Sequence, residues 1–247
     1  MSERRQSDQV VRSAQDDYDS LINVLPETPC PYLPGRSARN EAYLAGSLDG
    51  EHYERLMGRF FRRSGDVVYR PRCRGCTECQ PLRVPVATFR LTRSLRRVWA
   101  KNREVAVDVA TPVATREKFD IFLRYLDHQH DGTMSRAYES YREFLYESPL
   151  ETLEFRYRLG ARTIGLSIAD RCPNGLSSVY MYFDPDERSR SLGTLSVLHE
   201  IEYCRRVGMD YYYLGYYVAG CATMDYKARF RPNEILVAKG CWEPFRE

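Results

Sequence analysis

The stretch SVYMYFDPDERSRSLGTL, residues 178–195, decides the fold because it joins a strand to a helix through a short charged loop. Residues 179–183 are typical of a strand, and Arg188 and Arg190 flank the turn that follows. Ser191 suits a helix N-cap, and Gly193 allows a ligand to approach the backbone closely. Free N–H groups at such a helix start can bind a phosphate. The alternative is an ordinary helix cap with two exposed arginines.

Around this stretch, the second half of the chain alternates strand and helix patterns regularly. Residues 191–207 place apolar side chains on one helical face, and Gly208 ends the helix. The pattern predicts strand 104–109, helices 115–128 and 135–147, strands 152–159, 163–169 and 178–183, helix 191–207, strand 211–214, helix 222–228 and strand 234–239. We therefore predict an α/β (α+β) domain over residues 103–247.

The first half of the chain is less regular. Residues 1–17 lack apolar periodicity and predict a flexible tail. Residues 18–102 predict a smaller mixed domain that carries a cysteine cluster and many arginines. Its expected elements are strand 19–25, a helix at 51–63 stopped by Gly65, strands 66–69 and 82–89, and a basic helix from Thr92 or Ser94 to Lys101.

Composition and charge restrict the classes of protein to consider. A chain of 247 residues with 43% hydrophobic residues can bury a sizeable core. The N-terminus has no apolar signal region and no later stretch is long and apolar enough to cross a bilayer, so we expect a cytoplasmic protein. The net charge is +3, but Asp66 and Glu78 are the only acids between Arg59 and Arg103, a segment rich in arginine. This excess suits a polyanion, and a solvated basic face is the alternative.

Half of the cysteines form a candidate metal site. Cys73, Cys76 and Cys79 are each separated by two residues, which lets a loop wrap thiolates around one metal, and Cys30 is the natural fourth ligand. Zinc and an iron–sulfur cluster both fit this donor set, although a ferredoxin-type run would have its next cysteine where Arg83 stands. Free structural thiols are the alternative.

The element order of the second half is similar to the acyltransferase fold of the GNAT superfamily. In that fold the strand before the central helix separates from its neighbour, and the next loop binds the phosphates of coenzyme A. Arg190 and Gly193 fit the phosphate motif, but Leu195 replaces its last small residue. We expect the Leu195 side chain to obstruct a pyrophosphate, which argues against a coenzyme A-dependent N-acetyltransferase, the alternative function.

Further stretches extend the resemblance to nearly the whole chain after the tail. They are CPYLPGR (30–36), RRSG (62–65), YRPRC (69–73), RSLRR (93–97), SVYMYFDP (178–185), SLG (191–193), YLGY (213–216), GC (220–221) and MDYK (224–227). In this order they resemble the bacterial aminoacyl-tRNA–protein transferases. The closest resemblance is to the branch that moves leucine from leucyl-tRNA to proteins that begin with Asp or Glu.

The resemblance implies transfer of leucine, or of arginine as the alternative, from charged tRNA to a protein's N-terminal amine. The new N-terminus would mark the protein for degradation. The partners implied are aminoacyl-tRNA and acceptor proteins with N-terminal Asp or Glu. No membrane is implied, and we expect a monomer. Related transferases bind zinc or an iron–sulfur cluster through cysteines in this half, but Leu33 replaces one of their paired cysteines.

Catalysis should depend mainly on positioning, without a cofactor, because an aminoacyl ester is already activated and an α-amine with a pKa of about 8 is partly neutral in cells. Backbone N–H groups near Tyr180 and Tyr182 would stabilise the oxyanion. The candidate general base is Asp225 or Glu200, and Tyr216 or Tyr226 would donate a hydrogen bond to the leaving ribose oxygen.

Cationic side chains and the helix start supply the expected binding groups. The expected donor site consists of Arg188, Arg190, Ser191, Gly193 and Lys227. Guanidinium groups suit an acidic side chain, and the candidates for reading the acceptor are Arg36, Arg62 and Arg63.

Overall fold

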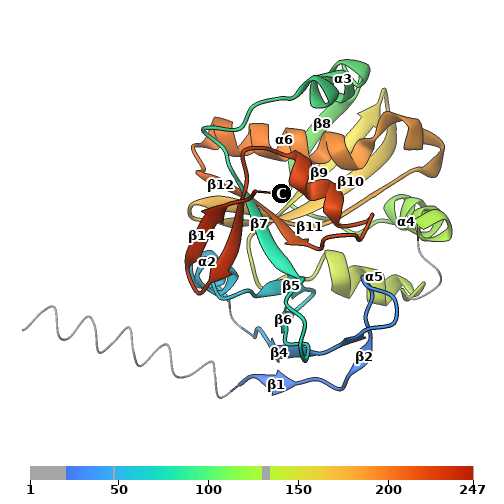
Figure 1. Cartoon of the computed structure of the whole chain (residues 1–247). Coiled ribbons are helices and arrows are strands. Elements are labelled where there is room, and N and C mark those ends of the chain that lie inside the picture. The colour runs from blue at the N-terminus through green and yellow to red at the C-terminus, as the bar shows by residue number, and fades with distance from the viewer. Residues whose placement is uncertain (1–20, 47, 130–133, 247) are drawn as a thin grey trace, which may run out of the picture.

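A computed structural model of the chain describes residues 21–46, 48–129 and 134–246. The tail expected at residues 1–17 lies outside these ranges. Within them, a large sheet with helices on both faces lies above a smaller sheet (Figure 1). No helix of the described ranges is long and apolar enough to cross a bilayer.

The large sheet has eight strands and contains the predicted strands of the second half. Every neighbouring pair is antiparallel except β11 and β12, which are parallel. In spatial order the strands are β14 (Cys241–Pro244), β13 (Glu234–Ala238), β7 (Gln80–Pro85), β12 (Tyr211–Tyr217), β11 (Gly175–Phe183), β10 (Arg162–Cys172), β9 (Thr152–Leu159) and β8 (Ala106–Ala110). The mixed α/β class predicted from the sequence is therefore confirmed.

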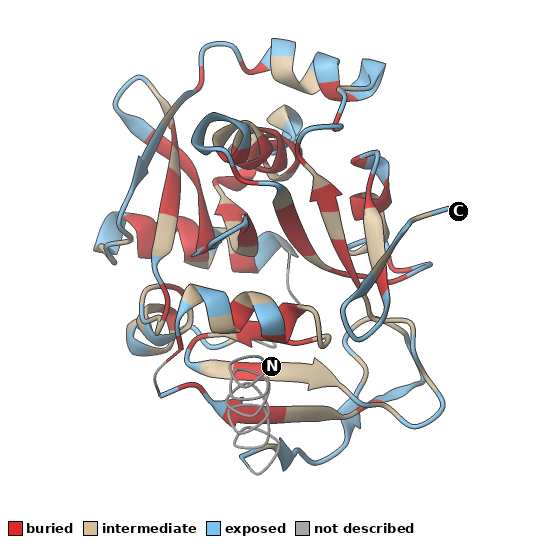
Figure 2. Ribbon diagram, turned by 90° about the vertical axis from the view of Figure 1, so that its left-hand side faces the viewer, coloured by how far each residue is buried: buried red, intermediate tan, exposed pale blue. Residues whose placement is uncertain are grey.

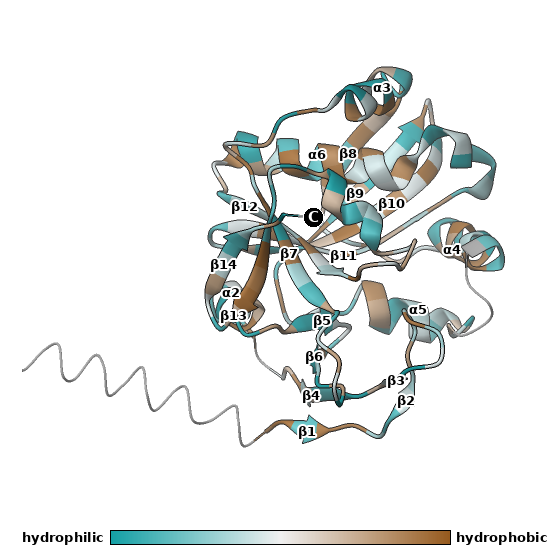
Figure 3. Ribbon diagram, viewed as in Figure 1, coloured by the Kyte–Doolittle hydropathy of each residue, from teal (hydrophilic) through white to brown (hydrophobic). Residues whose placement is uncertain are grey.

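Helices cover the two faces of this sheet. On one face lies α6 (Leu192–Val207), with α3 (Arg93–Lys101) packed outside it (Figure 1). On the other face α4 (Arg116–Gln129) and α5 (Tyr138–Leu145) enclose a second, aromatic core. The buried residues gather between these layers (Figure 2), and β13 is among the most hydrophobic segments (Figure 3). The predicted inner face of α6 is buried, at Thr194, Val197, Leu198, Ile201 and Cys204, and Gly208 ends the helix with φ +78°.

The smaller sheet is built entirely from the first third of the chain. Its spatial order is β1 (Asn23–Val24), β4 (Asn40–Leu44), β6 (Val67–Pro71) and β5 (Arg62–Ser64). The pair β2 (Thr28–Pro29) and β3 (Ser37–Ala38) forms a separate two-stranded ribbon, and α2 (Gly50–Met57) packs its apolar face into a local core.

The helix predicted over residues 51–63 is wrong beyond Met57. Phe60 adopts φ +73°, a left-handed conformation that ends the helical path, and residues 62–64 then pair with β6. Successive side chains of a strand point to opposite sides, so Arg62 and Arg63 reach different parts of the molecule. Because of this turn, Arg62 and Arg63 have different surroundings although they are adjacent in the chain.

Strand β7 crosses the domain division expected at residue 102. It lies between β12 and β13 and pairs antiparallel with both, although it belongs to the first half of the chain. The large sheet thus contains strands from both sides of residue 102. The division into two domains at that residue stays a prediction. Two short 3-10 helices complete the fold: η1 (Pro185–Arg190), and η2 (Asp225–Arg229) in place of the helix expected at 222–228.

Candidate active site

The central opening of the large sheet lies between β11 and β12. The two strands pair at Gly175 with Tyr211 and the next two positions only, while β11 continues to Phe183. At Gly215, with φ +84°, the register of β12 shifts by a bulge, which bends a strand. Beyond Ser177, β11 therefore has no strand partner on this side within the described residues, and its backbone groups there are free for a ligand.

The predicted phosphate-binding loop connects β11 to α6. Ser191 is the N-cap residue of α6, but it adopts φ +58° and its side chain makes no capping hydrogen bond. A Cβ atom added to Gly193 would meet nothing within 4 Å. The Ser191 N–H donates to the carbonyl oxygen of Arg188 and the Thr194 N–H to that of Ser191, so the N–H groups of Leu192 and Gly193 are the ones that this helix start offers to an anion.

The two arginines of the loop differ. Arg190 pairs with Glu187 at 2.6 Å and Glu104 at 2.9 Å, so its charge is already compensated. Arg188 is exposed, and it forms no ion pair with any carboxylate of the described residues. Of these two, Arg188 is therefore the one available to a phosphate.

The expected obstruction by Leu195 is wrong. Its side chain is only 1% exposed and packs in the core between α6 and the large sheet. It therefore cannot project into the phosphate loop, and it does not argue against coenzyme A.

The predicted catalytic tyrosines on β11 have rings engaged elsewhere. The Tyr182 hydroxyl hydrogen-bonds Tyr141 and Tyr146, each at 2.8 Å, and burial raises its pKa well above the ordinary value. The Tyr180 hydroxyl donates to the sulfur of Met134. Both rings pack with the α4 and α5 layer, so only the backbone of these residues can face the opening.

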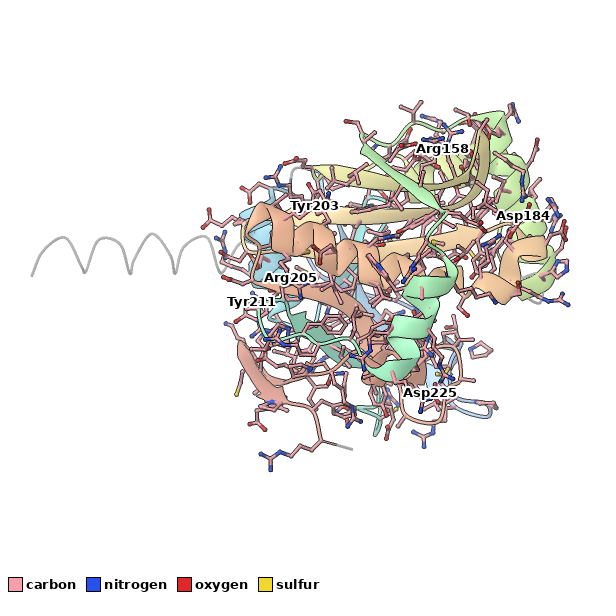
Figure 4. All side chains as sticks on the ribbon, turned by 90° about the horizontal axis from the view of Figure 1, so that it is seen from above. Arg158, Asp184, Tyr203, Arg205, Tyr211 and Asp225 are labelled. Atoms are coloured by element: carbon pink, nitrogen blue, oxygen red, sulfur yellow. The ribbon has the colours of Figure 1, made fainter. Side chains whose placement is uncertain are left out.

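The remaining catalytic candidates occupy different environments. Tyr216 is 3% exposed, and its hydroxyl donates to the carbonyl oxygen of Phe60 at 2.6 Å, which ties β12 to the smaller sheet. Asp225 starts η2 and lies well away from Asp184 of the phosphate loop (Figure 4). Glu200 is fully buried and accepts hydrogen bonds from Ser167 and Tyr212, which places it in the core.

The three candidate acceptor arginines also separate. Arg36 is exposed and donates to the sulfur of Cys76 at 3.4 Å. Arg63 is buried and binds both carboxylate oxygens of Asp170 at 2.7 Å, so the fold uses its charge fully. Arg62 is 4% exposed, and among the described residues it donates only to the carbonyl oxygen of Phe61, so its Nε and Nη2 atoms have no hydrogen-bond partner there.

Lys227 shares the environment of Arg62. It is 8% exposed, and its Nζ donates to the carbonyl oxygen of Tyr216 at 2.8 Å, while the Arg62 guanidinium lies 5.6 Å from the centre of the Tyr216 ring. Burial, and then the charge of Arg62, lower the Lys227 pKa to about 7. Neither cation pairs with a carboxylate of the described ranges. Because buried charge is costly without a counterion, this pair is suited to an anionic ligand.

Of the four predicted metal ligands, Cys79 lies close enough to Lys227 to influence its pKa. Cys30 accepts from the Leu33 N–H and Cys73 from the Arg39 N–H, both at 3.4 Å. Burial, followed by the charges of Cys73, Cys30 and Cys76, raises the pKa of Cys79 to about 12. As they stand, no three His, Cys, Asp or Glu side chains of the described residues could hold a metal ion.

Comparison with known proteins places the chain in a family. Residues 28–97 match the family model described as arginine-tRNA-protein transferase, N terminus, and residues 117–237 match the corresponding C terminus. The chain is 36% identical to an aspartate/glutamate leucyltransferase of Hahella chejuensis, over 88% of this chain and 94% of the relative. It is 40% identical to one of Gluconacetobacter diazotrophicus, over 87% and 84%. The chain belongs to the aminoacyl-tRNA–protein transferases.

The curated relatives of this transferase fall in its aspartate/glutamate leucyltransferase branch, as the resemblance implied. Among solved structures, the transferase is similar to FemX, with 9% identity, a TM-score of 0.46 and coverage of 84% of this chain and 67% of that chain.

In this transferase the predicted site residues occupy separate places. Arg188, Ser191 and Gly193 form the open helix start, and Arg62 and Lys227 form a buried cationic pair. From the sequence, Lys227 was assigned to the donor and Arg62 to the acceptor, and no local pattern indicated that both lie against Tyr216.

Proposed function

We propose that this enzyme transfers leucine from leucyl-tRNA to the N-terminal amine of proteins that begin with Asp or Glu. The observation that carries the acceptor assignment is the buried pair of Arg62 and Lys227, which faces no carboxylate of the described residues. An acidic N-terminal side chain would supply the missing anion, and charge-assisted hydrogen bonds to it would favour Asp and Glu over their amides. Arg36, which is exposed and donates to the sulfur of Cys76, is a secondary candidate.

The donor would bind at the opening of the large sheet. The separation of β11 from β12, followed by the open start of α6, supports an acyltransferase layout like that of the GNAT superfamily. In this arrangement Arg188 and the N–H groups near Ser191 and Gly193 bind phosphates of the tRNA 3′ end. Arg190 supports the loop through its two ion pairs.

The chemistry requires two substrates and no cofactor. The acceptor nitrogen attacks the ester carbonyl carbon of the aminoacyl-tRNA, a C–N bond forms, and the C–O bond to the ribose breaks. The proton lost by the amine ends on the ribose oxygen. The unpaired edge of β11 beyond Ser177 offers backbone N–H groups to the oxyanion. Positioning of both substrates beside this edge would account for most of the rate enhancement. Asp225 and the Tyr216 hydroxyl remain proposed proton carriers, and the latter would first have to leave Phe60.

A transfer assay tests this function directly. Labelled leucyl-tRNA is mixed with the full chain and peptides that differ only in the first residue: Asp, Asn, Glu, Gln or Ala. We expect label on the Asp and Glu peptides alone. Arginyl-tRNA in parallel tests the choice of amino acid, and acetyl-CoA tests the alternative function. Turnover of acetyl-CoA without transfer from either tRNA would overturn the proposal.

Two further features are proposed separately. Since charged tRNA is a cytoplasmic substrate, we place the enzyme in the cytoplasm. Zinc or an iron–sulfur cluster at Cys30, Cys73, Cys76 and Cys79 is supported by the N–H groups that already face two of these sulfurs, and binding would require the thiols to draw closer. Metal analysis and an absorption spectrum of anaerobically prepared protein would distinguish zinc, a cluster and free thiols.

A further inference from the structure

The arginine-rich segment divides into two parts in the structure. In its first part, most of the cations pair with acids. These pairs are Arg63 with Asp170, Arg70 and Arg72 with Glu41, Arg74 with Glu27, and Arg83 with Glu234. Between residues 90 and 103 no cation forms such a pair with an acid of the described residues. The exposed, unpaired cations of this second part are Arg90, Arg93, Arg96, Arg97, Lys101 and Arg103. The local excess of charge read from the sequence is therefore concentrated around α3.

Helix α3 directs these charges outward. Leu95 is buried and Trp99 packs against the core, so the opposite side of the helix faces solvent. Arg93, Arg97 and Lys101 follow one another at intervals of four residues, which aligns them in one stripe on that side. Like charges at this spacing repel each other. The first turn holds no acid, and Arg93 lies at the positive end of the helix dipole. This stripe is consequently a surface that an anion would stabilise.

The stripe is joined to the proposed donor loop. The Lys101 ammonium donates to the carbonyl oxygen of Ser189, and the Asn102 side-chain amide donates to that of Arg190 at 3.0 Å. These bonds fix the end of α3 beside the start of α6. Helix α3 lies at the top of the molecule in Figure 1 and faces the viewer in Figure 4. A ligand held at the loop could therefore extend along α3 without crossing the sheet.

A hollow lies on the inner side of α3, facing α6, and no residue of the stripe lines it. A cavity of about 390 Å³ lies between α3 and α6, with Trp99 and Ile201 in its lining and Arg90, Arg96 and Arg205 around it. Of the acids nearby, Glu202 pairs with Arg205 and Glu104 with Arg190. The cavity thus extends the basic surface without adding an unpaired acid.

We propose that the outer face of α3 binds the sugar–phosphate backbone of the tRNA acceptor stem while the 3′ end lies in the donor loop. The inference rests on the proposed function, because it takes aminoacyl-tRNA as the donor. The contacts are with phosphates, so they set the position of the stem without reading its sequence. They also make the affinity for tRNA depend strongly on salt.

The test measures tRNA binding separately from transfer. Labelled uncharged tRNA is titrated with the full chain at several salt concentrations, for the unaltered protein and for Arg93→Gln combined with Arg97→Gln. We expect the double variant to bind roughly tenfold more weakly, and the slope of log K against log salt to fall by about 2. The KM for the acceptor peptide should stay unchanged. A charge-conserving variant, Arg93→Lys with Arg97→Lys, should retain binding within a few-fold.

The matched control removes two arginines from another part of the surface. Arg55→Gln with Arg171→Gln loses the same charge from residues that pair with Glu51 and Glu151, and it should bind tRNA like the unaltered protein. Equal weakening in this control would show a general charge effect and overturn the proposal. Unchanged affinity and slope in the α3 variant would overturn it as well. Failure of the proposed function has a different signature, since the unaltered enzyme would then transfer nothing.

Discussion

Two adjacent buried arginines should respond in opposite ways to the same substitution. Arg63→Gln breaks the bidentate pair with Asp170 and leaves that buried carboxylate with the Thr152 hydroxyl as its remaining side-chain partner. Breaking a buried ion pair costs about 3–5 kcal/mol. In a domain of this size each kcal/mol shifts the melting temperature by about 2–4 °C, so we expect a fall of roughly 6–20 °C.

Arg62→Gln removes a guanidinium that has no ionic partner in the described part of the chain and whose Nε and Nη2 atoms make no hydrogen bond there. The loss of its bond to Phe61 is offset by the removal of an uncompensated buried charge, so the free energy of unfolding should stay within about 1 kcal/mol of the original. Activity should change far more. Losing one partner of a buried charge pair costs about 2–5 kcal/mol, which lowers kcat/KM for a peptide that begins with Glu by roughly 30-fold to several thousand-fold.

The assay compares kcat/KM for peptides that begin with Glu or Gln, and with Asp or Asn, alongside thermal unfolding of each variant. Peptides that begin with Asn or Gln lack the carboxylate, so Arg62→Gln should lower their kcat/KM only slightly. The preference for peptides that begin with Asp or Glu should therefore largely disappear. Arg63→Gln, measured at a temperature where it is folded, should keep that preference. If Arg62→Gln retains the preference, or loses as much stability as Arg63→Gln, Arg62 is a structural residue and the proposed acceptor site is refuted.

Three other predictions follow from single side chains. Gly193→Val should fold normally because its Cβ would meet nothing within 4 Å, yet raise the KM for leucyl-tRNA at least tenfold; an unchanged KM would remove the helix start from the donor site. Lys227 loses its proton near pH 7 when folded but near 10.5 when unfolded, so the unfolded chain binds more protons between these values and stability should rise with pH. Urea unfolding at pH 7 and pH 9 should show this rise and its loss in Lys227→Met. Burial raises the Glu200 pKa from 4.5 to about 7, so the contribution of Glu200 to stability should fall as pH rises across that range. Glu200→Gln should flatten the dependence of the unfolding free energy on pH. An unaltered pH dependence in this variant would show that Glu200 is not its cause.

Local patterns predicted the parts of the fold that depend on local physics. The inner face of α6 and its end at Gly208 follow from helical periodicity and from a glycine in a left-handed conformation. The bounds of β9 were predicted at 152–159 and agree with the structure. The same periodicity indicates a buried Leu195, since it lies three residues from both Leu192 and Leu198. The phosphate motif, which has a small residue at this position, led to the wrong expectation of an exposed side chain.

The parts that were missed depend on contacts between distant residues. Residues 58–63 continue a helical pattern, and pairing of β5 with β6 overrides it. The convergence of Arg62 and Lys227 has no signature in either local sequence, because it is created by the turn at Phe60 and by η2 lying beside β12. The charges of Arg62, Arg63 and Arg97 look equivalent in the sequence. Their surroundings in the structure distinguish them: Arg62 is a buried cation without a counterion among the described residues, Arg63 forms an ion pair in the core, and Arg97 is a surface charge.

The position of β7 also determines when the enzyme can assemble. This strand leaves the ribosome early, but the strands on both sides of it, β12 and β13, are among the last to be synthesised. Pairings over such separations form slowly, because a long loop must close before any contact is gained. The sheet beside the opening between β11 and β12 therefore cannot be completed until β12 and β13 have been synthesised, more than 120 residues after β7.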